Sequence, residues 1–455
     1  NLSVDQLTLI LSGFGVNIYD ADSTRPCLVM QSQNPYDTVR YYGKVHPLTA
    51  PLHLAFISLY FGGPKASLTQ YRVMELGCGD GSNLIPLAFY SPECEFIGID
   101  NSARQLNAAQ EKVDSLQLTN IQFEQLDVEN LSPQDCGEFD YIIAHGLFSW
   151  IKEEARRAVL SFCHGSLASS GLAYICYNAM PGWSIRGTLR DILRGSRKVC
   201  EASTSKKAEA AQSVIRELYE DLPSRDHAFG DLMAREFEYI LSAEPFYVQH
   251  EYLAEENQPY WISEFVQMAT EHGLEYVGDA QFGKPEGRLP QGISETLASR
   301  SLSVVEQEER ADLLSQRTLR ASVLCRKNAP RSSISRRQLL DEVFNASDLA
   351  PVSDPFNMQN GVVEKFYGRS AVEITLDESV TKAAILQLST CWPLGMKFET
   401  LLTKATQMLR EIEFPVPGDA EKTLESEITE LLTLGEVEWR LREPVDTSQP
   451  FIKKR

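Results

Sequence analysis

Three glycines at alternate positions, Gly77, Gly79 and Gly81, follow an apolar stretch of the chain. A tight turn often needs φ > 0, and a missing Cβ lets a ligand lie directly on the backbone. The polar residues Ser82 and Asn83 can then begin a helix, whose unpaired amides would face a carboxylate or a phosphate. The spacing differs from the Gly-x-Gly-x-x-Gly of dinucleotide enzymes. We therefore predict a small-molecule binding loop here.

Two acids follow the next two predicted strands. Asp100 ends an apolar strand about 20 residues after the loop, where a doubly wound fold places the carboxylate that accepts ribose hydroxyls. Asp127 ends the following strand, where an acid can accept the exocyclic amine of adenine, and Val128 beside it can cover the ring. With Glu75 two residues before the first glycine, the loop resembles motif I of class I S-adenosylmethionine (SAM) methyltransferases.

The predicted SAM site groups residues around this loop, which we expect to hold the methionine end of the cofactor. Tyr36 would reach it from the N-terminal segment, and His145 from the end of the fourth strand. The predicted cofactor-binding residues are Tyr36, Glu75, Gly77, Cys78, Gly79, Gly81, Asn83, Asp100, Asn101, Gln105, Asp127, Val128 and His145.

The acceptor of the methyl group would lie opposite the loop. His145 is a candidate base or cofactor contact, and a structural histidine bonded to backbone is the alternative. The predicted catalytic residues are His145, Tyr177 and Asn178, and the predicted substrate residues are Trp150, Tyr177, Asn178 and Trp183. Trp183 could equally be a core anchor. No metal site is predicted, because the cysteines are scattered and no Cys-x-x-Cys occurs.

The elements that position these residues alternate between strand and helix, which indicates a parallel sheet with crossover helices. Ligands of such sheets lie outside the carboxyl ends of the strands. The predicted strands span residues 71–76, 95–100, 121–126, 139–144 and 172–177, and a helix with apolar positions up to Leu167 precedes the fifth. Two later candidates, 274–282 and 319–326, would complete seven strands with the last one antiparallel.

Helical patterns dominate two other regions. Residues 184–253 carry predicted helices at 185–199, 205–222 and 231–241, which we interpret as an insertion for dimerisation or a lid. Arg186, Arg190 and Arg194 share one helix face there, either solvated or facing an acidic or dimer partner. The excursion 283–316 contains residues 306–310, expected to be a solvated charge cluster.

After a polar linker, helices at 337–344, 379–391, 397–412 and 422–434 and a strand at 436–441 resemble a winged-helix module. The fold class is α/β: a Rossmann-like seven-stranded class I methyltransferase sheet with a helical insertion, plus a C-terminal α+β, winged-helix-like domain. The predicted domains are 1–33 (N-terminal extension), 34–183 (SAM-binding core, first part), 184–253 (insertion), 254–328 (completion of the sheet) and 335–455 (C-terminal domain).

Composition excludes several classes of protein. The net charge of −20, and 20 acidic against 14 basic residues in 335–455, disfavour nucleic-acid binding and are compatible with a basic protein partner. No apolar run approaches the length of about 20 residues that a membrane helix requires. No signal peptide is predicted at the start of the chain, and nine scattered cysteines indicate reduced thiols. We therefore expect a soluble, cytoplasmic protein without membrane insertion.

Several stretches together resemble the bacterial methyltransferases that carry a methyltransferase regulatory domain, among them the rickettsial outer-membrane-protein lysine methyltransferases. The stretches are Asn34-Pro35-Tyr36-Asp37, His46-Pro47, residues 75–83, residues 141–146 with Ser149-Trp150, and Tyr177-Asn178 with Pro181-Gly182-Trp183. Val45, Cys78 and Asp80 depart from the family pattern.

The resemblance implies a SAM-binding domain, a helical dimerisation insert, a middle region and a C-terminal domain around an open cavity. It further implies methyl transfer from SAM to a lysine amine of a protein or peptide, with S-adenosyl-L-homocysteine as product, by a homodimer formed through the insertion. Two alternatives remain: a small-molecule N- or O-methyltransferase, and a SAM-sensing interaction protein without turnover.

Overall fold

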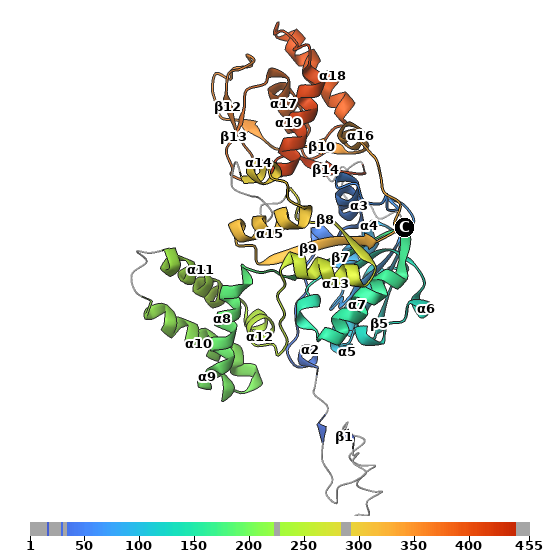
Figure 1. Ribbon diagram of the computed structural model, residues 1–455, viewed down its shortest axis with the longest axis vertical. Coiled ribbons are helices and arrows are strands. Elements are labelled where there is room, and N and C mark those ends of the chain that lie inside the picture. Colours follow the sequence, from blue (N-terminus) through green and yellow to red (C-terminus); the bar gives the residue numbers. More distant parts are fainter. Residues whose placement is uncertain (1–15, 18–28, 31–33, 223–227, 284–292, 443–455) are drawn as a thin grey trace, which may run out of the picture.

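The computed structural model describes residues 16–17, 29–30, 34–222, 228–283 and 293–442, and a seven-stranded sheet forms its centre (Figure 1). The strand order is β5-β4-β3-β6-β7-β9-β8, and β9 runs antiparallel to both of its neighbours. This confirms the predicted Rossmann-like sheet and its antiparallel last strand. The strands are β3 (Arg72–Leu76), β4 (Glu95–Asp100), β5 (Ile121–Gln125), β6 (Phe139–Ala144), β7 (Leu167–Asn178), β8 (Leu274–Asp279) and β9 (Leu319–Arg326).

Apolar side chains alternate between the two faces of the central strands, because successive residues of a strand point to opposite sides. In β3, Val73 belongs to the core on one face and Met74 to the core on the other. Helices α3 (Pro51–Tyr60), α4 (Leu84–Tyr90) and α5 (Ala103–Leu116) cover the first face. Helices α7 (Glu153–Ser166) and α13 (Ile262–Glu271) cover the second.

Strand β7 begins earlier than predicted. Leu167, expected as the last apolar position of a helix, is the first residue of the strand, and α7 ends at Ser166. Leu167 pairs with Phe139 of β6, and a register shift separates this pair from the pairing that begins at Tyr141. The irregular pairing explains why periodicity detected only the second half of β7.

The insertion between β7 and α13 is helical and has a hydrophobic core of its own. The helix predicted at 185–199 is interrupted, because Ser196 has an extended backbone after Gly195. A further helix, α12, was not predicted as a separate element. The helices are α8 (Trp183–Gly195), α9 (Arg197–Cys200), α10 (Lys207–Glu220), α11 (Ala228–Ser242) and α12 (Pro245–Tyr252).

The expectation of a solvated charge cluster at residues 306–310 is wrong for Glu308. These residues lie in α15 (Val304–Ser315), which follows α14 (Ile293–Ala298). The Glu308 carboxylate lies 2.7 Å from a guanidinium nitrogen of Arg320, which is fully buried in β9. Asp279 and Asp312 contact the same guanidinium at 2.9 and 2.6 Å. The buried arginine therefore holds one face of α15 against the sheet through its ion pairs with Glu308 and Asp312.

The C-terminal domain is α+β, as predicted, and packs on α3 (Figure 1). Trp439 stacks on Phe56 of α3 with ring centroids 4.0 Å apart. A three-stranded sheet of short strands in this domain was not predicted. The elements are α16 (Arg336–Glu342), β10 (Phe344–Ala346), β11 (Ala350–Pro351), β12 (Glu364–Tyr367), β13 (Ile374–Leu376), α17 (Ser379–Cys391), α18 (Phe398–Glu411), α19 (Ala420–Leu434) and β14 (Glu438–Arg440). Within the described ranges, every helix is too short or too polar to cross a bilayer.

Candidate active site

The glycine loop between β3 and α4 contains three residues with positive φ: Gly77 (70°), Gly79 (53°) and Gly81 (70°). At Gly81 a Cβ would lie 2.8 Å from side-chain atoms of Ile85 and Phe123, so packing requires this glycine. At Gly79 the position of a Cβ has no described atom within 4 Å. The loop therefore presents bare backbone to open space at Gly79, as a bound ligand needs.

Asp100 fixes the other side of this space. One carboxylate oxygen accepts a hydrogen bond from the Gly79 amide at 2.9 Å, and the other accepts one from the Ser102 amide at 2.8 Å. Burial raises the pKa of Asp100, whereas the hydrogen bonds from Ser102 and Gly79 lower it. The structure thus brings the predicted ribose ligand against the predicted loop.

Glu75 lies beneath the loop with its side chain buried. Its Oε1 accepts a hydrogen bond from the Asn83 amide at 2.8 Å, while its Oε2 has no hydrogen-bond partner in the described part of the chain. Burial raises the pKa of the Glu75 carboxyl to about 8. A ligand that brings an ammonium group to this oxygen would complete its hydrogen bonding, so the site fits the amino-acid end of SAM.

The loop's own polar residue, Asp80, holds the loop to its surroundings. Its carboxylate lies 2.9 Å from the Lys112 amine of α5 and 3.6 Å from the Arg40 guanidinium. Cys78 is buried, and its sulfur packs closely against Gly98. A Cβ added to Gly98 would lie only 2.8 Å from that sulfur. The two departures from the family pattern that lie in the loop, Cys78 and Asp80, are thus packed into the protein and leave the face at Gly79 open.

A segment that we call the strap, residues 34–50, crosses the edge of the site. It contains α2 (Pro35–Thr38). The Asn34 side chain donates to that of Asn101 at 2.8 Å, and the Gln105 side chain donates to the Tyr41 carbonyl at 2.8 Å. These contacts bring the predicted residues Asn101 and Gln105 to the site. From the strap, sequence reasoning selected Tyr36 as a site residue and did not select Asn34 or Tyr41. Single polar contacts between distant segments leave no periodic pattern in the sequence.

His145 follows β6 and is held as a neutral ring. Its Nδ1 lies 2.9 Å from the Tyr174 hydroxyl, and its ring stacks on that of His46 with centroids 3.6 Å apart. Burial and the neighbouring His46 lower the pKa of His145 to about 3. A group this weakly basic is a poor proton acceptor near neutral pH. The geometry therefore favours a hydrogen-bonding role for His145 over that of a general base.

Asp127 and Val128 lie at the end of β5, next to Asp100 on β4. Asp127 is exposed, and its carboxylate accepts the amide of Glu129 at 3.1 Å. Val128 is buried in the core on the side of α7. Both residues are at the expected edge of the sheet, and the outward carboxylate of Asp127 retains acceptor capacity for an amine.

The predicted acceptor residues separate into two groups. Tyr177 is part of the core: its hydroxyl lies 3.1 Å from that of Ser322, and its ring stacks on Phe265 at 4.1 Å. The alternation of β7 explains this, because it turns Tyr177 toward α13 and Tyr174 toward α3. The structure thus does not bring Tyr177 to the glycine loop, and it is Tyr174 that contacts His145.

Asn178, Trp150 and Trp183 lie at the junction with the insertion. The Asn178 amide nitrogen of the side chain and the indole nitrogen of Trp183 are buried without a described hydrogen-bond partner. Trp183 is 2% exposed and meets Trp150 edge to face at 6.1 Å. This burial agrees with the alternative interpretation of Trp183 as a core anchor.

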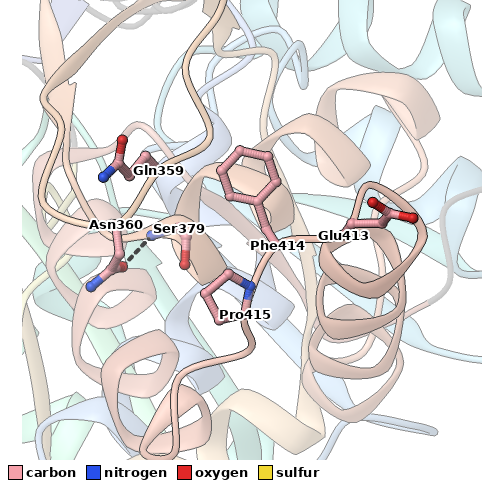
Figure 2. Close-up of a pocket in the computed structure, with 6 residues that line it drawn as sticks. All are labelled: Gln359, Asn360, Ser379, Glu413, Phe414 and Pro415. Atoms are coloured by element: carbon pink, nitrogen blue, oxygen red, sulfur yellow. Dashed lines mark hydrogen bonds between the residues drawn. The ribbon is translucent and has the colours of Figure 1, made fainter.

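A cavity of about 400 Å³ lies in the C-terminal domain and involves none of the predicted site residues (Figure 2). The Asn360 side chain accepts a hydrogen bond from the Ser379 amide at 2.8 Å, which caps α17. Its lining residues are Gln359, Asn360, Ser379, Glu413, Phe414 and Pro415.

Known proteins resemble this chain along most of its length. Residues 73–171 match the methyltransferase domain family, and residues 244–326 match a predicted methyltransferase regulatory domain. An uncharacterized protein of Rickettsia prowazekii is 31% identical over 297 residues, 64% of this chain and 52% of that protein. Another uncharacterized R. prowazekii protein is 27% identical over 234 residues, 51% of this chain and 93% of that protein. The chain thus spans about half the length of the first relative.

Among solved structures, PKMT2 from Rickettsia typhi in complex with AdoHcy superposes with a TM-score of 0.77. The two share 24% sequence identity, and the match covers 89% of this chain and 78% of PKMT2. At this identity the likeness establishes the fold. The fold is that of the Rossmann-like methyltransferases, and residues 73–171 and 244–326 are similar to the methyltransferase domain and to the predicted methyltransferase regulatory domain.

Proposed function

We propose that the protein transfers a methyl group from SAM to the side-chain amine of a lysine in a protein or peptide. One observation carries the cofactor part of this proposal. The bare backbone at Gly79, the Asp100 carboxylate bonded to it and the unpartnered oxygen of Glu75 surround the same loop. This arrangement offers an acceptor for a ribose, a partner for an ammonium group and space for a ligand between them.

We assign the cofactor's contacts accordingly. Glu75 would bind the amino group, Asp100 the ribose hydroxyls and Asp127 the adenine amine, with Val128 against the ring. When bound, SAM supplies a sulfonium methyl group that moves to a nucleophile while the carbon–sulfur electron pair stays on sulfur. PKMT2, which shares this fold, was solved with AdoHcy, and this supports the assignment.

Lysine as the acceptor is supported by the fold shared with PKMT2 and by the motifs that resemble rickettsial lysine methyltransferases. The net charge of −20 favours a basic partner. A lysine amine has an unperturbed pKa of about 10.4, so it must lose a proton before it can act as a nucleophile. Orientation in a site that excludes water can supply much of the remaining acceleration.

The proposal is tested by incubating the protein with methyl-labelled SAM and a panel of proteins, followed by mass spectrometry of the labelled residues. We expect label on lysine. Label on a carboxylate, a hydroxyl group or a small metabolite would refute the lysine assignment, and binding of SAM by calorimetry without label on any acceptor would refute methyl transfer. The homodimer through α8–α12 is a separate proposal, which light scattering coupled to size exclusion tests directly.

A further inference from the structure

Near the end of the strap, the backbone of His46 is held on both sides. Its amide donates a hydrogen bond to Oδ1 of Asn83 at 2.9 Å. Its carbonyl accepts the Thr49 amide at 3.0 Å and the Thr49 hydroxyl at 2.8 Å. Both partners are buried, with Thr49 0% and Asn83 5% exposed. The backbone of His46 therefore has a fixed position, from which its side chain projects in a defined direction.

The same Asn83 side chain reaches the candidate cofactor site. Its amide nitrogen donates to Oε1 of Glu75 at 2.8 Å and to the Thr49 hydroxyl at 3.1 Å. One buried amide group thus connects the carboxylate beneath the glycine loop with the strap. His46 is consequently separated by a single side chain from the residue to which we assign the amino group of the cofactor.

The ring of His46 lies on the ring of His145. Their centroids are 3.6 Å apart, and the interplanar angle is 28°. Within the described ranges, the His46 ring has no hydrogen bond and stacks on no other ring. Burial is the largest cause that lowers the pKa of both histidines, so the two neutral rings can stack without charge repulsion near pH 7. The stack on His145 is therefore the contact through which the His46 ring can act.

The sheet places His145 beside the glycine loop. Strands β3 and β6 are parallel neighbours, so the loops that follow them lie at the same edge. A Cβ added to Gly77 would lie only 3.1 Å from the Leu147 side chain, which shows how closely these two loops approach each other. At Gly146, the position of a Cβ has no described atom within 4 Å. His145 therefore borders open space next to the candidate cofactor site.

One ring nitrogen of His145 is bound inside the protein. Nδ1 lies 2.9 Å from the hydroxyl of Tyr174, a fully buried residue of β7. Nε2 has no hydrogen-bond partner among the residues that the structure describes. In a neutral imidazole one nitrogen donates a hydrogen bond and the other accepts one. Nε2 is thus the nitrogen of His145 that is available to a bound molecule.

We propose that His46 is a positioning residue for methyl transfer, whose ring holds the His145 imidazole so that Nε2 accepts a hydrogen bond from the substrate amine. This inference rests on the proposed transfer to an amine. A neutral amine attacks with its lone pair, so it offers only N–H donors to the groups around it. Nε2 must then be the accepting nitrogen, and Nδ1 carries the proton and donates to the Tyr174 hydroxyl oxygen. The hydrogen bond orients the amine and leaves its lone pair free.

The alternative, a direct contact of His46 with substrate or cofactor, differs in what it requires of the ring. Positioning requires a flat ring against His145, which a phenyl group also provides. A direct contact requires a ring nitrogen, which a phenyl group lacks. His46→Phe and His46→Ala therefore separate the two roles. Val45→Ala is the control, because this neighbouring strap side chain is 56% exposed.

The first test needs neither cofactor nor substrate. The intact chain carries ¹⁵N-labelled histidine, and the NMR resonances lost in His145→Gln identify the ring nitrogens of His145. At pH 7.5 we expect one neutral tautomer, with the proton on Nδ1, in wild type, Val45→Ala and His46→Phe. A mixture of both tautomers is expected in His46→Ala, which loses the stack, and in Tyr174→Phe, which loses the hydrogen bond. A proton on Nε2 in wild type, or a wild-type spectrum in His46→Ala, would overturn the proposal.

The second test measures kcat and KM with a lysine peptide found by the labelling experiment. His46→Ala should lower kcat by about 10- to 100-fold with little change in KM, which is the size of effect that a misplaced contact produces. Its affinity for S-adenosylhomocysteine, measured by calorimetry, should be unchanged, because the bond to Asn83 is made by the backbone. His46→Phe should keep kcat within about threefold of wild type, since the stack is retained.

A loss of kcat in His46→Phe as large as that in His46→Ala would overturn the positioning role, because it would show that a ring nitrogen is required. A wild type that labels no amine would refute the proposed function. The NMR spectra would then still decide whether His46 and Tyr174 fix the tautomer of His145, so the two failures are distinguishable.

Discussion

Glu75 makes the stability of the protein depend on pH, and Glu75→Gln is expected to remove that dependence. Burial raises the pKa of this carboxyl from 4.5 to about 8 in the folded state. Below pH 4.5 both the folded and the unfolded chain hold the proton. Between these values only the folded chain holds it, so the free energy of unfolding falls by about 1.36 kcal/mol for each pH unit. From pH 5 to pH 8 the decrease attributable to Glu75 is about 4 kcal/mol.

Urea unfolding of wild type and Glu75→Gln at pH 5, 6, 7 and 8 measures this effect. The variant leaves a buried amide NH₂ unpaired, which costs about 1–3 kcal/mol at every pH. Other titrating groups are common to both proteins. The difference between the two proteins should therefore change by about 4 kcal/mol in favour of the variant as the pH rises. Glu111→Gln, an exposed position on α5, is the control and should show no such change. A difference that stays constant from pH 5 to pH 8 would refute a buried, protonated Glu75.

Three further predictions concern the loop and the sheet. Asp100→Ala should weaken SAM binding by about 1–3 kcal/mol in calorimetry, since a charge-assisted hydrogen bond is lost, and unchanged affinity would contradict the ribose assignment. Gly79→Ala should abolish SAM binding and lower the melting temperature less than Gly81→Ala, because both glycines have positive φ but, of the two, only Gly81 has protein atoms 2.8 Å from its Cβ position; unchanged SAM affinity in Gly79→Ala would count against ligand clearance there. Arg320→Met should destabilise the protein by about 3–5 kcal/mol in urea unfolding, because the buried carboxylates of Asp279 and Asp312 lose one of their two cations and keep only Arg317, and a change below about 1 kcal/mol would rule out a structural ion network.

Much of the fold was predictable because the strands of a parallel sheet are buried on both faces and form continuous apolar runs. The stretches at 95–100 and 139–144 coincide with β4 and β6. The strands β11 and β13 have two and three residues and were missed, because elements this short contain no period that a sequence can reveal.

The candidate site likewise contains residues that the sequence predicted correctly and residues whose positions it did not predict. Gly79 and Asp100 were predictable, because the loop and the strand end are consecutive parts of a local pattern. Whether Tyr177 lines the site or the core depends on the face of β7 to which its side chain points. A shift of one residue along the strand places a side chain on the opposite face. Arg190 shows the same limit: periodicity placed it on a helix face, but only the folded chain shows that it is 4% exposed and bonded to backbone carbonyls. Long-range contacts of this kind have no counterpart in local sequence.

The sheet is shared between the two matched families, although the sequence families divide the chain. The regulatory match at 244–326 supplies β8 and β9, and β9 pairs with the outer edge of β7 along residues 173–178. Val323 and Leu324 enter the cores on opposite faces. A gene fragment ending after β7, at residue 178, would therefore encode a sheet with a long, apolar, unpaired edge, which promotes aggregation. The two segments form one folding unit, so they must be expressed, and are expected to be inherited, together.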